Sequence, residues 1–216
     1  ALSIGGVRTG AGNDRIVLDN AVGLTEGDAG KDLFQLGAVG ATYTNLSGEV
    51  VENPEATVLG GAGDDEVRIT GTDGVGENAT VNGGLGNDTI EVSDDNATVQ
   101  GAIFGSDGDD SISFTNLGAA TGKIDGGAGA DTIVATGNIA GEIIGGGEGN
   151  VFKFSQSTVL FGGAKITTGA GDENVILTQV DVGSDAGEGI INITGGAGQN
   201  FLGVSYNGTN ETDFPQ

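Results

Sequence analysis

A glycine-rich turn followed by an alternating apolar segment recurs along the whole chain, and this recurrence limits the folds open to it. The clearest copy runs from 83 to 92 and reads Gly-Gly-Leu-Gly-Asn-Asp-Thr-Ile-Glu-Val. Glycines adopt backbone angles that other residues avoid, so consecutive carbonyl oxygens of the turn can point towards one place. After the turn, Ile90 and Val92 share one face, as in a half-buried strand.

The last glycine of each turn, here called the marker glycine, recurs at intervals of about 20 residues or more, which is typical of a solenoid. The copies lie at Gly12, Gly30, Gly63, Gly86, Gly108, Gly129, a degenerate copy near Gly149, Gly171 and Gly198. The long interval between Gly30 and Gly63 holds either a motif-free coil or an excursion within 37–56. The strand-like segment 38–42 and the turn-like Asn53-Pro54 favour the coil.

Apolar residues recur four and six places after the marker glycine, and a second set recurs five places before it. We therefore predict an all-β, right-handed parallel β-solenoid (a β-roll) with coils of about 20–23 residues. The expected organisation is a single domain over 1–216 with a C-terminal tail at 205–216. The degenerate turn 146–150 is interpreted as having lost a residue, which places Ile144 in the core.

An acidic residue stands two places after most marker glycines, where a turn could present it to a metal ion. Calcium takes six to eight oxygen ligands from carboxylates and carbonyls and tolerates irregular geometry, whereas magnesium requires a strict octahedron. One isolated copy would be read as a tight turn with a solvated Asp, but copies in phase favour several Ca2+ ions along one edge. The predicted metal-binding residues are Gly10, Gly12, Asp14, Gly30, Asp32, Gly61, Gly63, Asp65, Gly84, Gly86, Asp88, Gly108, Asp110, Gly127, Gly129, Asp131, Glu173 and Asn200.

The charge of the chain narrows its partners. Seven Lys and Arg residues against 31 Asp and Glu residues leave a net charge of −24. This balance argues against nucleic acid and anionic membranes and favours cations. The chain has no Cys and no His, so disulfides and zinc, copper or haem sites are not expected. No apolar run approaches the roughly 20 residues of a membrane helix, so we expect no membrane insertion.

Catalysis is not expected either. Without His or Cys an enzyme would rely on carboxylates and basic groups, and the basic residues are scattered along the chain. A flat ligand-binding or ice-binding face would need a regular row of Thr or Asn on one outer strand. The residues six places before the markers are too irregular for this, since they include Thr80, Ala102 and Lys123.

The turns at 60–67, 83–90 and 126–133 resemble the nonapeptide GGxGxDxUx of the RTX (repeats-in-toxin) calcium-binding family. The resemblance implies a parallel β-roll, calcium-driven folding outside the cell and, usually, type I secretion. One departure is the spacing, because family toxins often run these nonapeptides back to back. Here the motif comes once per coil, as in the extender and ligand-binding regions of some RTX adhesins and surface-layer proteins.

Together these features predict a calcium-stabilised extracellular structural protein that folds on calcium binding after secretion. It would be a subunit or module of a surface layer, filament, adhesin stalk or biofilm matrix. The alternative is a C-terminal calcium-binding secretion module from a larger RTX enzyme or toxin. Neither end of the sequence shows an evident capping element, which favours a homo-oligomer or end-to-end assembly unless caps belong to a longer protein.

Overall fold

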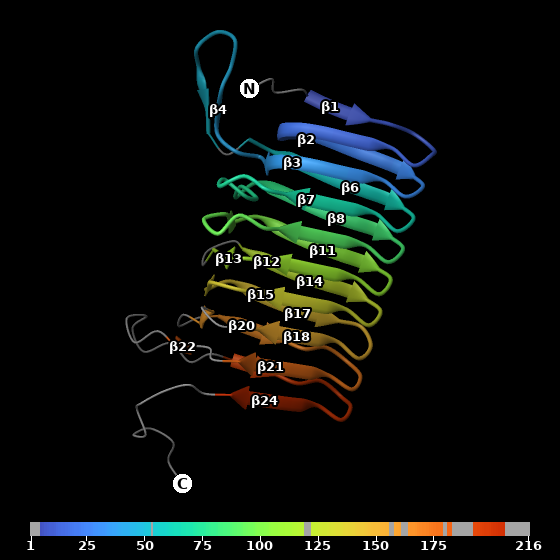
Figure 1. Ribbon diagram of the computed structural model, residues 1–216, viewed down its shortest axis with the longest axis vertical. Helices are drawn as coiled ribbons and strands as arrows, with labels where there is room; N and C mark the ends of the chain where they lie inside the picture. Colours follow the sequence, from blue (N-terminus) through green and yellow to red (C-terminus); the bar gives the residue numbers. More distant parts are fainter. Residues whose placement is uncertain are drawn as a thin grey trace.

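The computed structural model describes residues 5–52, 54–118, 122–155, 158–160, 164–178, 181–182 and 192–205. These residues form an elongated stack of β-coils, and this part of the chain contains no helix (Figure 1). The coils follow one another along the long axis, with β1 near one end and β24 at the other. The predicted all-β parallel solenoid is therefore confirmed.

Two parallel ladders build most of each coil, one before and one after the glycine-rich turn. The first ladder contains β1 (Gly5–Arg8), the second half of β2 (Arg15–Ala29), β6 (Ala56–Ala62), β8 (Ala79–Leu85), β11 (Ala102–Asp107), β14 (Lys123–Ala128), β17 (Glu142–Gly146), β20 (Lys165–Thr167) and β23 (Asn192–Thr194). The second contains the first half of β2, β3 (Leu33–Val39), β7 (Glu66–Ile69), β9 (Thr89–Val92), β12 (Ser111–Phe114), β15 (Thr132–Ala135), β18 (Val151–Phe154), β21 (Asn174–Thr178) and β24 (Phe201–Ser205).

The predicted inward phase of these strands is correct for most coils. In β9, for example, Ile90 and Val92 are buried and pair in register with Ile112 and Phe114 of β12. Stacking like positions in register places apolar side chains in continuous columns inside the coil, where their removal from water stabilises every interface between coils. Outward positions are more exposed, as at Val17 of β2.

A third ladder of very short strands was missed by the sequence interpretation. Its members are β10 (Thr98–Val99), β13 (Asn116–Leu117), β16 (Asn138–Ile139), β19 (Val159–Leu160) and β22 (Asp181–Val182). Val99, Leu117 and Ile139 lie in register and are fully buried or nearly so. This column gives the coil a third apolar side, which extends through single bridges to Val75 and Val39.

The long interval between Gly30 and Gly63 contains an excursion, so the favoured hidden coil is wrong. β2 pairs directly with β6, and β3 pairs directly with β7, so no coil separates them. The extra residues form an antiparallel hairpin of β4 (Tyr43–Thr44) and β5 (Val50–Val51), which protrudes from the stack (Figure 1). Asn45 closes its turn by accepting the backbone N–H groups of Ser47 and Glu49 through Oδ1, each at 3.0 Å.

The degenerate turn near Gly149 has also kept its full length. Ile143, rather than Ile144, pairs with Ile124 and is buried. The six-residue turn therefore begins at Gly145, and Glu148 takes the place of the marker glycine. The prediction that this turn had lost a residue, with Ile144 in the core, is wrong because alignment on Gly149 shifts the coil by one residue.

Candidate functional site: a column of buried turn carboxylates

The residues two places after the marker position lie above one another along the turn edge. We call this set the turn column: Asp14, Asp32, Asp65, Asp88, Asp110, Asp131, Asn150, Glu173 and Asn200. The structure thus brings together every acidic residue that was predicted to bind metal. Asn150 is a further member of the column. It was not predicted because the degenerate turn had been aligned on Gly149 instead of Glu148.

From Asp32 onwards, each turn-column side chain connects its own coil to the preceding one. The backbone N–H of Asp65 donates to Oδ1 of Asp88 at 2.7 Å, and the N–H of Asp88 donates to Oδ1 of Asp110 at the same distance. The pattern continues from Asp14 as far as Asn200. A carboxylate that accepts a backbone N–H forms a charge-assisted hydrogen bond, so the column ties neighbouring turns together.

The second carboxylate oxygen of these side chains has no hydrogen-bond partner, although it is buried. This holds for Oδ2 of Asp14, Asp32, Asp65, Asp88, Asp110 and Asp131, and for Oε1 of Glu173. Five turn-column residues are at most 2% exposed: Asp32, Asp65, Asp88, Asp110 and Asp131. A buried charged oxygen without a donor is costly, so these atoms require a proton, a cation or a donor from elsewhere.

Each orphaned oxygen in the middle coils lies against a glycine three places before the marker. We call these the cradle glycines: Gly27, Gly60, Gly83, Gly105 and Gly126. A Cβ at Gly105 would lie within 3.0 Å of both Oδ2 of Asp110 and the carbonyl oxygen of Gly126 in the next coil. The absence of a side chain therefore allows two oxygens, which both accept hydrogen bonds, to approach the backbone closely at this point. The cradle glycines were not predicted from the sequence, although the first Gly of each Gly-Gly pair marks most of them.

The marker glycines have a different structural role. Gly63 and Gly86 have φ values of +129° and +122°, which other residues rarely adopt. A Cβ on Gly63 would also collide with the carbonyl oxygen of Gly30 in the preceding coil. The marker carbonyls thus abut the next marker along the stack. The carbonyls found beside the orphaned oxygens come from the cradle positions instead of converging from one turn, as the sequence had suggested.

A second, exposed column runs beside the first and was also missed. The backbone N–H of Asp109 donates to Oδ1 of Asn87, and the N–H of Ala130 donates to Oδ1 of Asp109. These bonds run in the opposite sense, from a coil back to the side chain of the coil before it. The signal in the sequence was the recurrence of Asn or Asp directly after the marker glycine, as at Asn13 and Asp64.

Burial makes several carboxylates of the column hard to ionise. It raises the pKa of Asp88 to about 7, helped by the charges of Asp110 and Asp65, while the hydrogen bond from the Asp65 backbone opposes the shift. Burial also raises the pKa of Asp65 and of Asp110 to about 6. For Asp131 the pKa is likewise raised, chiefly by burial. These carboxyl groups therefore hold their protons at a higher pH than an exposed Asp does.

These oxygens fit a hard cation such as Ca2+, which prefers carboxylate and carbonyl ligands. Beside Gly105, for example, Oδ2 of Asp110 lies near the carbonyl oxygen of Gly126, and no donor binds this Oδ2. No three acidic side chains gather into one cluster within the described ranges. A calcium ion here would take few carboxylates and complete its shell with backbone carbonyls and water.

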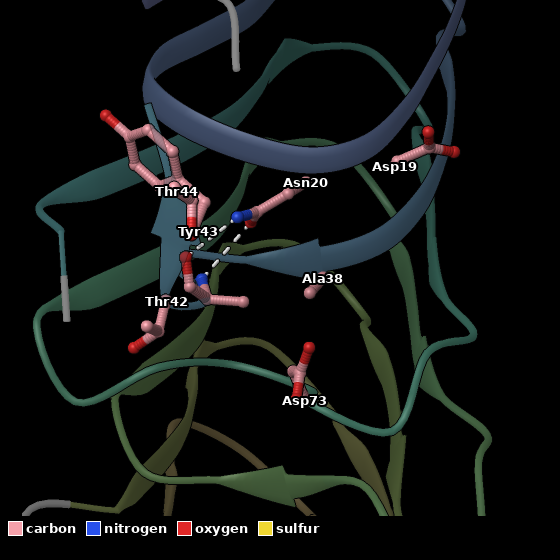
Figure 2. A pocket seen from close by; sticks show the side chains of 8 residues that line it. Asp19, Asn20, Ala38, Thr42, Tyr43, Thr44 and Asp73 are labelled. Carbon is pink, nitrogen blue, oxygen red and sulfur yellow. Dashed lines mark hydrogen bonds between the residues drawn. The ribbon is translucent and has the colours of Figure 1, made fainter. Parts of the chain in front are cut away.

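A separate cavity of about 300 Å³ lies at the base of the hairpin, beside Asp19 and Asp73 (Figure 2). Its buried polar residue, Asn20, is already used structurally. Nδ2 of Asn20 donates to the carbonyl oxygen of Ala41 at 2.8 Å, and Oδ1 accepts the N–H of Ala41 at 3.1 Å. The Asn20 side chain thus holds the hairpin to the coil. The two acidic residues beside the cavity, Asp19 and Asp73, are exposed to solvent.

The described residues form no helix of membrane-spanning length and hydrophobicity. Comparisons with protein-family models, with curated proteins and with solved structures find no match to the chain.

Proposed function

We propose that the chain is a calcium-stabilised structural protein of the cell exterior, a subunit or module of a surface layer, filament, adhesin stalk or biofilm matrix. The observation that supports this proposal is the column of buried Asp carboxylates whose second oxygens lack donors beside the cradle glycines. Such a column repels itself when ionised, whereas bound cations turn it into a series of cross-links between coils.

Calcium would also couple folding to location. Forty-five glycines make the unfolded chain costly to order, and the net charge of −24 opposes compaction. A cation that binds only the folded coils stabilises them by mass action, so folding becomes favourable where calcium is abundant. The resemblance of the turns to the RTX motif agrees with such folding after secretion.

An exposed end supports assembly. In the described part of the chain, β24 pairs on one side only, with β21. Phe201 and Leu202 of β24 are 59% and 54% exposed, although the register partner of Leu202 is the buried Val175. We propose that a second copy covers this end. Sedimentation with and without calcium should then show association that Leu202→Asp reduces.

Calcium titration tests the proposed function. Circular dichroism should show that EDTA lowers strand content, that calcium restores it and that equal magnesium does so much less. Asp88→Ala should weaken calcium binding measured by calorimetry, whereas Glu91→Ala, on the outer side of β9, should not. Unchanged spectra in EDTA, or equal affinities for the two variants, would contradict the proposal.

A further inference from the structure

Asn150 occupies the turn column as the Asp residues do but supplies its own donor. Its Oδ1 accepts the backbone N–H of Asp131 at 2.8 Å, as each Asp does for the coil before it. Its Nδ2 donates to the carbonyl oxygen of Thr168 at 3.0 Å. Thr168 is the residue three places before the marker glycine of the next coil, so this carbonyl corresponds to that of Gly126 beside Asp110.

We call each turn-column residue, together with the cradle position and the carbonyl beside it, a level. The Asn150 level has a hydrogen-bond donor that the Asp levels lack. At Asp110 the atom corresponding to Nδ2 is Oδ2, which has no partner and lies near a carbonyl that also accepts. An amide nitrogen in this position makes a hydrogen bond, whereas an ionised carboxylate oxygen is left uncompensated. Asn150 therefore satisfies internally the interaction for which the Asp levels need an external positive charge.

The other levels outside the central Asp segment also differ from it. At the first level, Thr9 replaces a cradle glycine and its hydroxyl donates to the carbonyl oxygen of Gly27 at 3.2 Å. At Asn200, Nδ2 donates to the carbonyl oxygen of Gly196 at 3.1 Å. At Glu173, whose Oε1 also lacks a partner, the buried Thr168 takes the place of the cradle glycine.

We propose that Asn150 is a built-in, metal-independent joint at the C-terminal side of the calcium-binding levels, which are those of Asp32, Asp65, Asp88, Asp110 and Asp131. The coils that Asn150 connects through Asp131 and Thr168 then stay stacked without calcium, and the central coils join this stack when the metal binds. Because each coil of a solenoid contacts only its neighbours, one part of the stack can remain folded while another opens. This inference rests on the proposed calcium function for its metal-binding part alone.

Reciprocal substitutions test the joint. Asp110→Asn places an amide where Asn150 has one, so it should raise the melting temperature of the EDTA-treated protein by about 5 °C and lower the number of calcium ions bound. Asn150→Asp should lower the melting temperature in EDTA by a similar amount and raise the number of calcium ions bound. Asp95→Asn and Asn96→Asp make the same charge changes on an exposed segment and should shift neither quantity appreciably.

Hydrogen exchange of the wild-type protein in EDTA gives an independent reading. Amides of β18 and β21 should stay protected while those of β8 and β12 exchange. A lower melting temperature for Asp110→Asn in EDTA, or uniform loss of protection along the stack, would overturn the joint. If the wild type bound no calcium, the proposed function would fail, yet the opposite temperature shifts in EDTA would still support Asn150 as a self-satisfied joint.

Discussion

The raised pKa values of the column predict that the calcium-free protein becomes less stable as the pH rises towards neutrality. The ordinary pKa of 3.8 for Asp is raised to about 7 at Asp88, a difference of about 3 units. Each unit corresponds to about 1.4 kcal/mol, so deprotonating this one buried group costs the folded state up to about 4 kcal/mol. Asp65 and Asp110, with pKa values of about 6, add up to about 3 kcal/mol each.

The direction follows from proton binding. Between about pH 4 and about pH 7 the folded chain holds protons that the unfolded chain releases, so its stability falls as the pH rises through this window. The protonated column contributes fully below about pH 4, and the contribution is lost above about pH 7. Losing even one such contribution is serious for a domain whose total stability is about 5–15 kcal/mol.

Thermal unfolding in EDTA, followed by circular dichroism between about pH 4 and about pH 8, measures this effect. A triple variant, Asp65→Asn with Asp88→Asn and Asp110→Asn, should show a much flatter dependence. The control replaces three exposed acids outside the column, Asp73→Asn, Glu77→Gln and Asp95→Asn, and so makes the same change in net charge. It should keep the wild-type slope.

Two results would contradict this pH dependence. The first is a wild-type melting temperature in EDTA that stays constant or rises with pH. The second is an equal slope for both triple variants, which would assign the effect to overall charge repulsion instead of the column. With calcium present the competition reverses the trend, because protons displace the metal, and calcium affinity should weaken as the pH falls through about 7 to about 6.

Three further predictions concern the scaffold. Gly63→Ala should destabilise the protein by several kcal/mol in urea unfolding, because it adds a collision with Gly30 to the positive-φ cost; Gly48→Ala, with φ +80° and open space, should lose only about 1 kcal/mol. Ile139→Ala should cost about 2–5 kcal/mol through a core cavity, whereas the exposed Val17→Ala should stay within about 0.5 kcal/mol in the same assay. Replacing 43–51 by a short turn should leave the far-UV spectrum and calcium binding almost unchanged, because the hairpin lies outside the stack.

Much of the fold could be predicted because a solenoid repeats the same pattern of apolar residues and glycines in each coil. The phase of Ile90 and Val92 recurs in nearly every coil. The buried face of a strand can therefore be identified from the other copies even where one copy is ambiguous. The third ladder was missed because its strands, such as Asn116–Leu117, are two residues long and show no alternation. The hairpin was missed because its strands resemble those of a coil, and only pairing over long range distinguishes the two.

The candidate site was predictable in its residues but not in its contacts. The position of Asp88 in the motif pointed to a shared role, yet its hydrogen bond to the Asp65 backbone exists only when two coils are stacked. At Asn150 the run of glycines allowed two alignments. The bonds of Asn150 to its neighbours identify the correct one, and these depend on coils that are 19 and 18 residues away.

The Gly-Gly pair of the motif combines two physical requirements that the sequence presents as one. The second glycine of each pair, such as Gly84, has a positive φ, and a Cβ there would meet the carbonyl oxygen of Gly61. Asp28 and Ser106 nevertheless occupy this position in other coils, with φ of +75° and +88°. The first, such as Gly60, has no such angle and is required because a Cβ would meet the carboxylate of Asp65 and the next carbonyl. The first glycine thus lets a buried carboxylate and a carbonyl oxygen pack closely against the backbone, and Gly60→Ala should impair calcium binding more than Gly84→Ser does, a comparison that calorimetry can decide.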